Sequence, residues 1–274
     1  MSAIPLTYRR LPTAAGGDRS ASDSWRNGLN AHGQPQLAQR VALVVGASSG
    51  IGRAVAARCA GMGMKVALAA RNAALLDELA TELRGQGAAV LVCPLDVRDR
   101  LAIDAAVARI GAEWERLDLV VYATGTNTKE RALDRLTPEG WSELLDTNLT
   151  GAFHVTQAVL PGMRAAGDGL IIYISSNAAN RPDMSGVAYQ ASKRGMVGLA
   201  HGVMEEERQR GIRTTVIFPG LTDTPLLLKR PTPTPPEIVA RALQPDDVAD
   251  ACVFVASLAG RAHVPELVLI PSRL

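Results

Sequence analysis

A tyrosine and a lysine four residues apart carry the clearest chemistry in this sequence. Tyr189 and Lys193 lie in a stretch with helical character, where a spacing of four places two side chains on one face. A free phenol has a pKa of about 10 and exchanges protons poorly at neutral pH, but a neighbouring ammonium lowers that pKa. The pair therefore predicts proton transfer to or from a substrate oxygen. An amphipathic helix with an exposed lysine can show the same spacing, so a catalytic assignment also depends on the motifs around the pair.

A glycine-rich segment supplies part of that context. It reads Gly46-Ala47-Ser48-Ser49-Gly50-Ile51-Gly52 and follows an apolar run. Glycines in such a turn let the backbone approach a pyrophosphate, and the free N–H groups of the next helix attract negative charge. An ordinary strand-to-helix turn is the alternative. The position after the first strand of an alternating chain favours a dinucleotide site.

The elements that would position these residues alternate regularly from residue 41 onward. Amphipathic stretches predict helices over 50–62, 72–84, 98–114, 138–166, 188–210 and 245–258. Seven short apolar runs predict strands over 41–45, 65–70, 89–93, 119–124, 170–176, 212–218 and 267–270. Strands that are apolar throughout and separated by helices predict an α/β fold with a doubly wound parallel sheet of the Rossmann type. We expect one domain over 41–274, preceded by a flexible arm over 1–40.

Composition narrows the function classes. The chain has 274 residues, of which 47% are apolar, and a net charge of +2, which is too small to indicate nucleic-acid binding. No apolar run has the length of a membrane span, and the start lacks the apolar core of a secretory signal. The three cysteines lie far apart in apolar segments. They predict core packing in a reducing, cytoplasmic setting and no metal site.

The glycine spacing, taken with five further segments, resembles the short-chain dehydrogenase/reductase family over roughly residues 40–272. The resemblance implies a single-domain oxidoreductase that binds a nicotinamide dinucleotide. The supporting segments are Asp96-Val97 after the third strand, Asn148 before Gly151, Ser176 at 13 residues before Tyr189, the Tyr189-x3-Lys193 pair, and Pro219-Gly220-x3-Thr224.

The resemblance also implies roles. Tyr189 would exchange the proton, and Ser176 would hold the substrate oxygen. Lys193 would lower the phenol pKa and bind the nicotinamide ribose, and Asn148 would hold a water that links Lys193 to solvent. Asp96 would contact the adenine, while Pro219, Gly220 and Thr224 would fix the carboxamide end of the cofactor. Ser175 is the competing serine, which we expect to be satisfied by backbone instead.

The second strand indicates which cofactor is used. A carboxylate at its end would bind the adenosine ribose hydroxyls, but Arg71 stands there and suits a 2′-phosphate. We therefore expect NADP(H) rather than NAD(H). Arg53 either helps or is a solvated helix arginine. The sequence departs from the family after the fourth strand, where Tyr122-Ala123-Thr124 replaces the usual Asn-Asn-Ala, while the glycine needed near the cofactor is kept as Gly125.

The substrate is less well defined. A ketone or secondary alcohol is expected, with the segment 225–236 as a lid and with Met184 and Val187 shaping an apolar wall. A catalytically silent NADP-binding sensor or scaffold is the alternative function. Family resemblance further implies a homo-oligomer, a tetramer or dimer. Apolar residues of the 188–210 helix would serve that interface or pack on the protein's own sheet: Met196, Leu199, Val203 and Met204.

Overall fold

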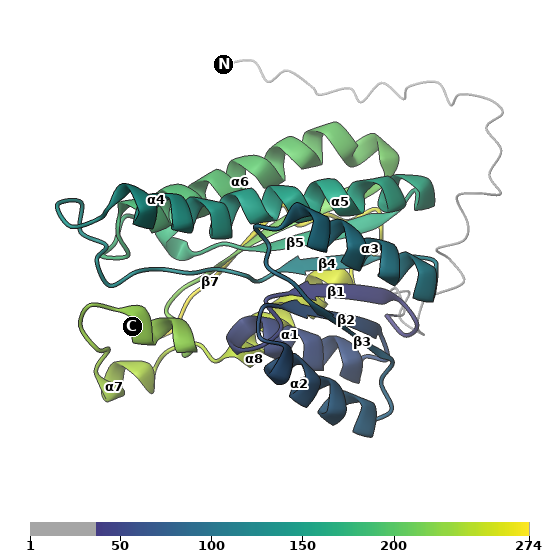
Figure 1. Ribbon diagram of the computed structural model, residues 1–274, viewed down its shortest axis with the longest axis horizontal. Coiled ribbons are helices and arrows are strands. Elements are labelled where there is room, and N and C mark those ends of the chain that lie inside the picture. Colours follow the sequence, from purple (N-terminus) through teal and green to yellow (C-terminus); the bar gives the residue numbers. More distant parts are fainter. Residues whose placement is uncertain (1–36, 274) are drawn as a thin grey trace, which may run out of the picture.

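A seven-stranded parallel sheet forms the centre of the molecule (Figure 1). The computed structural model describes residues 37–273. The strands lie in the order β3-β2-β1-β4-β5-β6-β7, and every neighbouring pair is parallel. Their bounds are β1 Val41–Val45, β2 Lys65–Ala70, β3 Val90–Pro94, β4 Leu119–Tyr122, β5 Gly169–Ile174, β6 Ile212–Pro219 and β7 Glu266–Leu269. The predicted doubly wound α/β fold is confirmed.

Helices cover both faces of this sheet (Figure 1). One face carries α1 (Gly50–Gly61), α2 (Ala73–Gly85) and α8 (Pro245–Ala256). The other carries α3 (Arg100–Trp114), α5 (Gly151–Ala166) and α6 (Val187–Glu207), with α4 (Pro138–Leu145) leading into α5. A single turn, α7 (Pro236–Val239), stands apart from both layers.

Alternation along each strand explains the two layers. In β1, Ala42 and Val44 pack into the core under α1, whereas Leu43 packs into the core under α5. Successive side chains of a strand point to opposite faces, so a strand that is buried on both must be apolar throughout. Met196 of α6 is fully buried in the second core. That burial accounts for its apolar character without a partner chain, and the homo-oligomer stays a prediction.

Two strands end earlier than the sequence predicts. The runs over 119–124 and 170–176 were expected to be strand throughout, but β4 ends at Tyr122 and β5 at Ile174. One further backbone hydrogen bond follows each strand, from the N–H of Ala123 to the carbonyl of Val45 and from the N–H of Ser175 to the carbonyl of Ile217, both at 2.8 Å. The next residues form loops at the carboxyl edge of the sheet.

The chain is helical throughout the predicted segment 138–166, but not with uniform pitch. A π-helical turn, Asp146–Thr150, separates α4 from α5. The N–H of Gly151 donates to the carbonyl of Asp146, a bond that spans five residues instead of four.

Most of the predicted 1–40 arm lies outside the described residues. Of the part that is described, Leu37 is buried in the core, and the N–H of Gln39 donates to the carbonyl of Gly63 at 2.8 Å. Within residues 37–273, no helix is long and apolar enough to cross a bilayer, and no group of three or more His, Cys, Asp or Glu side chains is placed to hold a metal ion.

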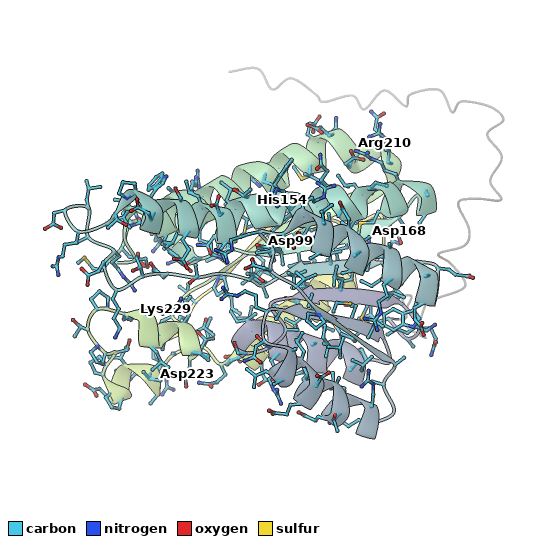
Figure 2. All side chains as sticks on the ribbon, in the orientation of Figure 1. Asp99, His154, Asp168, Arg210, Asp223 and Lys229 are labelled. Carbon is cyan, nitrogen blue, oxygen red and sulfur yellow. The ribbon has the colours of Figure 1, made fainter. Side chains whose placement is uncertain are left out.

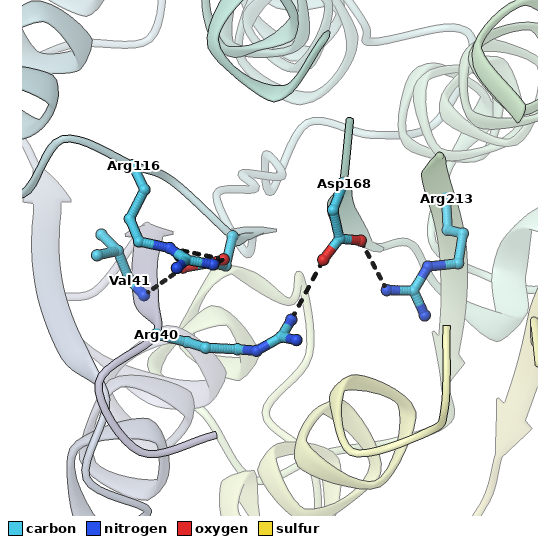
Figure 3. Close-up of polar contacts among 6 residues, drawn as sticks. Arg40, Val41, Arg116, Asp168 and Arg213 are labelled. Carbon is cyan, nitrogen blue, oxygen red and sulfur yellow. Dashed lines mark hydrogen bonds and ion pairs between the residues drawn. The ribbon is translucent and has the colours of Figure 1, made fainter. Parts of the chain in front are cut away.

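Charged side chains tie together the amino ends of the strands (Figure 3). The carboxylate of Asp118, just before β4, accepts the N–H of Val41 at 2.8 Å and pairs with Arg116. The carboxylate of Asp168, just before β5, lies 3.5 Å from both Arg40 and Arg213. We call these five charged residues the amino-end cluster.

Candidate active site

A cavity of about 730 Å³ opens at the carboxyl ends of the strands. It spans the point where the strand order reverses between β1 and β4, the place at which open α/β sheets bind ligands. The wall runs from the glycine turn and the end of β2 to the start of α6. It includes Gly46, Ser48, Ser49, Gly50, Ile51, Arg71, Asp96, Val97, Gly125, Thr126, Ser175, Tyr189, Lys193, Thr224, Leu226 and Lys229.

The glycine turn is built for a close approach. Gly46 has a φ of +96°, and a Cβ there would lie 2.8 Å from the backbone nitrogen of Thr124. A Cβ on Gly52 would lie only 2.1 Å from the Gly46 carbonyl oxygen, so glycine is needed although Gly52 is not on the cavity wall. The turn leads into the amino end of α1, where unpaired N–H groups suit a pyrophosphate. The cavity and its turn therefore fit a dinucleotide.

The far end of the cavity carries Arg71. Asn72 follows it and caps α2, its Oδ1 accepting the N–H of Leu75 at 3.1 Å, so no carboxylate stands at the end of β2. Arg53 is committed elsewhere, because its guanidinium pairs with Glu78 and Glu82 of α2. Of the two arginines considered, only Arg71 lies on the cavity wall.

Asp96 also lines this end, but its carboxylate is engaged. Arg98 forms a two-pronged pair with it at 2.6–3.1 Å. That bonding holds the pKa of Asp96 below its usual range, with Arg71 adding a smaller effect in the same direction. Asp96 is therefore ionised and already oriented.

Tyr189 and Lys193 share one face of α6, as predicted, and both line the cavity. The Lys193 ammonium lies 5.9 Å from the centre of the Tyr189 ring and donates to the carbonyl of Ile174 at 2.8 Å. Both residues are buried. Burial lowers the pKa of Lys193 to about 8.

The phenol itself behaves differently from the expectation. Burial raises the pKa of Tyr189, against a hydrogen bond from Ser176 and the charges of Arg131 and Arg230, which lower it. Asp183 raises it slightly further. In the absence of a cofactor, desolvation outweighs these neighbours. Tyr189 is therefore a protonated phenol at neutral pH, the form that can give a proton away.

The hydroxyls of both serines after β5 form hydrogen bonds with backbone groups. Ser175 is buried and its hydroxyl donates to the carbonyl of Lys193 at 3.0 Å. The hydroxyl of Ser176 accepts the N–H of Ala178 at 3.2 Å and also meets Tyr189. Ser175, not Ser176, contributes to the cavity wall. The Ser175 hydroxyl nevertheless uses its hydrogen in a bond to a backbone carbonyl.

Asn148 sits in the π-helical turn, fully buried. Its Oδ1 accepts the N–H of Thr126 at 2.7 Å, while its Nδ2 donates to the Thr126 carbonyl and to the hydroxyl of Ser192 at 2.9 Å. Ser192 in turn donates to the carbonyl of Tyr189 at 2.8 Å. Both amide hydrogens are used, so the side chain could hold a water only through the remaining lone pair of Oδ1. Sequence reasoning missed Thr126 and Ser192, whose partners lie 22 and 44 residues from them.

The unusual Tyr122 explains a neighbouring glycine. Its buried hydroxyl donates to the carbonyl of Thr147 at 2.5 Å and so braces the π-helical turn. A Cβ on Gly151 would lie 2.6 Å from that hydroxyl oxygen. Gly125 keeps a second approach open, since its Cβ would lie 3.1 Å from the Lys193 nitrogen. The departure from the family pattern therefore supports the turn that holds Asn148.

Not every predicted residue reaches the cavity. Pro219 ends β6 and Gly220 follows it, both outside the wall; a Cβ on Gly220 would lie 2.8 Å from Pro271, so packing against the segment after β7 accounts for that glycine. Thr224 does line the wall, beside Gly50.

The expected apolar wall at the substrate end has other members. Met184 is 92% exposed and Val187 is also exposed, so neither shapes it. Leu226 lines the cavity, and both Leu226 and Leu136 pack against the buried cluster of Leu144, Ala178, Ala188 and Tyr189. Leu136 carries no motif, so only the folded chain reveals its position.

Comparisons with known proteins point in one direction. A sequence model of the family described as short chain dehydrogenase matches residues 40–233. D-threitol dehydrogenase of Mycolicibacterium smegmatis is 36% identical over 233 residues, 81% of this chain and 87% of that protein. A metagenomic short-chain oxidoreductase solved with NADP superposes with a TM-score of 0.75 at 30% identity, over 87% of this chain and 100% of that one. The 3-ketoacyl-(acyl-carrier-protein) reductase of Brucella melitensis, solved with NADH, gives 0.79 at 27% identity, over 86% and 99%.

Proposed function

Because the chain belongs to the short-chain dehydrogenase family, it is an NAD(P)-dependent oxidoreductase acting on CH–OH groups, and we propose that it transfers a hydride between NADP(H) and a ketone or secondary alcohol. One observation carries this proposal. Tyr189 and Lys193 line the same cavity as the glycine turn Gly46–Gly52 and Arg71. Proton-handling groups thus face one end of a dinucleotide-sized space and phosphate-binding groups the other.

When bound, the reduced cofactor supplies the hydride that adds to the carbonyl carbon. Tyr189 gives its phenolic proton to the carbonyl oxygen, so that the C=O group becomes CH–OH, and the reverse transfer serves alcohol oxidation. Ser176 holds that oxygen by a hydrogen bond. Burial keeps the phenol protonated, which suits the reductive direction at neutral pH.

Lys193 and Asn148 support the proton transfer. The charged ammonium of Lys193 favours the phenolate left behind and holds the nicotinamide ribose. Asn148 fixes the loop at Thr126 and, through Ser192, the first turn of α6. A water on its Oδ1 would connect Lys193 to solvent.

Cofactor preference follows from the far end of the cavity. Arg71 is exposed on the wall, and the end of β2 carries no carboxylate that would repel a phosphate. A guanidinium binds a 2′-phosphate through paired N–H groups. We therefore propose NADP(H) as the preferred cofactor. Ser48, Ser49, Ile51, Val97, Gly125 and Thr224 complete the site around it.

The test is NADPH oxidation with a panel of ketones, comparing wild type with Tyr189→Phe. We expect turnover of at least one ketone and a loss of kcat of about 10³-fold in the variant, within the range for removing a positioned acid. Tight NADPH binding without turnover of any ketone or alcohol would favour a silent binding protein instead.

A further inference from the structure

Three cationic side chains gather at the substrate end of the cavity. Arg131 comes from the loop after β4, and Lys229 and Arg230 come from the segment 225–236. Lys229 lines the cavity, and Figure 2 labels this residue. The charges of Arg131 and Arg230 both reach Tyr189. We call these three residues the cationic group.

Arg131 is the most buried of the three, at 9% exposure. Its guanidinium donates to the carbonyl of Thr128 at 2.9 Å and to the carbonyl of Lys229 at 2.6 Å. Gly186 makes room for it, since a Cβ there would lie 2.7 Å from the Cβ of Arg131. Arg131 therefore fixes the backbone at Lys229 while bringing a positive charge into a desolvated position.

The other two cations also have neutral partners. The Lys229 ammonium donates to the hydroxyl of Thr126 at 2.5 Å, and Arg230 donates to the hydroxyl of Thr234 at 3.1 Å. Among residues 37–273, none of the three forms an ion pair with a carboxylate. Asp183, an exposed residue, is the acid that acts on Arg131 and on Tyr189.

The cost of this arrangement falls on Arg131, because the Lys229 side chain is exposed and the Arg230 side chain is half-buried. Like charges repel, and the positive charge of Arg230 adds to burial in lowering the pKa of Arg131. A desolvated cation is normally offset by an anion. Thr126, which holds the Lys229 ammonium, is itself held by Asn148, so the unpaired charge lies at the catalytic end of the cavity, away from Arg71.

We propose that the carbonyl substrate carries an anionic group, a carboxylate or a phosphate, which the Lys229 ammonium binds beside Tyr189. This inference rests on the proposed function and narrows its substrate class. Arg131 acts as a positioning residue by holding the backbone at Lys229, and Arg230 adds to the positive potential. Leu226, on the cavity wall, offers an apolar surface to the rest of the substrate.

The experiment uses compounds that differ in charge. Acetoacetate is compared with methyl acetoacetate, and dihydroxyacetone phosphate with dihydroxyacetone, to separate a carboxylate from a phosphate. Each is assayed with wild type, Lys229→Gln and the matched control Lys129→Gln. Lys129 is an exposed lysine of the same loop region as Arg131 and is not on the cavity wall.

We expect wild type and Lys129→Gln to prefer the anionic member of one pair by about 10-fold or more in kcat/KM, the size of one charge-assisted hydrogen bond. Lys229→Gln should lose that preference through a higher KM for the anionic compound. Its kcat/KM for the neutral compound and its KM for NADPH should stay within about 3-fold. The anionic compounds are also tested as competitive inhibitors of the best neutral ketone of the panel, with inhibition weakened about 10-fold in Lys229→Gln.

The outcomes separate the two proposals. Turnover of neutral ketones, with neither preference for nor inhibition by either anion, overturns the anionic substrate class and leaves the oxidoreductase function standing. If Lys229→Gln loses kcat/KM equally on charged and neutral compounds, Lys229 supports the loop; if it raises the KM for NADPH, Lys229 binds the cofactor. Either result also overturns the anionic substrate class. Failure to reduce any carbonyl compound overturns the proposed function, and this inference with it.

Discussion

Two groups of charged residues at opposite ends of the parallel sheet differ in their partners: the amino-end cluster contains carboxylates, and the cationic group contains none. At the amino ends, Asp118 pairs with Arg116, and Asp168 pairs with both Arg40 and Arg213 (Figure 3). Every charged residue of the amino-end cluster therefore has a partner of opposite charge within it. At the carboxyl ends, Lys193 and the cationic group have only carbonyl and hydroxyl partners among residues 37–273. Figure 2 labels Asp168 and Lys229 at these opposite ends.

The difference teaches what each end is for. Charges that are paired with an opposite charge within the chain stabilise the fold. Charges with only neutral partners lower the stability of the free protein, and proteins keep such charges where a bound ligand offsets that loss. The comparison therefore predicts that substitutions at the carboxyl end change catalysis, whereas those at the amino end change the free energy of unfolding.

The largest effect is expected at Lys193. Lys193→Gln should lower kcat/KM for ketone reduction by about 10³-fold, because the charge that supports the phenolate is lost. In wild type, the pKa of Lys193 is lowered to about 8, so the ammonium is present below that pH and absent above it. Reduction should therefore weaken as pH rises through about 8, with Tyr189 still protonated because its own pKa is raised.

The measurement is a profile of kcat/KM against pH, with Lys65→Gln as the control. Lys65 begins β2 at the amino end of the sheet, and the same substitution there should leave the profile unchanged. A flat wild-type profile through pH 8, together with a loss of less than about 10-fold in Lys193→Gln, would remove Lys193 from the mechanism.

The next largest effect concerns Arg71. Arg71→Ala should lower kcat/KM with NADPH by about 30-fold or more, the value of a guanidinium–phosphate pair, and change kcat/KM with NADH by less than about 3-fold. Initial rates with both cofactors test this. Arg53→Ala is the matched control, because Arg53 already pairs with Glu78 and Glu82. Higher kcat/KM with NADH than with NADPH in wild type would reverse the proposed preference.

The smallest effect is expected at the amino end. Asp118→Asn removes a buried charge from its pair with Arg116 and should lower the free energy of unfolding by about 2 kcal/mol, while kcat stays within about 2-fold. Asp104→Asn breaks an exposed pair with Arg100 and should cost only about 0.5 kcal/mol. Denaturant unfolding and steady-state rates measure the two quantities. A large loss of kcat in Asp118→Asn without a change in the free energy of unfolding would contradict the proposal that the amino end serves stability and the carboxyl end serves catalysis.

Much of this molecule follows from its sequence. The apolar strands and the glycine turn predicted the sheet and the dinucleotide-sized cavity, because periodicity and turn chemistry act locally. Residues joined across long stretches were beyond reach: Arg131 holds the Lys229 carbonyl 98 residues away. The outward side chain of Met184 and the inward one of Leu136 likewise depend on tertiary packing that no local pattern records.

The π-helical turn Asp146–Thr150 amounts to a spare residue in an otherwise regular helix. Removing one residue there would replace the bond that spans five residues with an ordinary one that spans four, and the wider turn would be lost. Helix content would be preserved, yet Asn148 would no longer point at Thr126. The number of residues in this turn is therefore as strictly constrained as their type. A deletion that preserved the helix would still break the contact between Asn148 and the loop at Thr126.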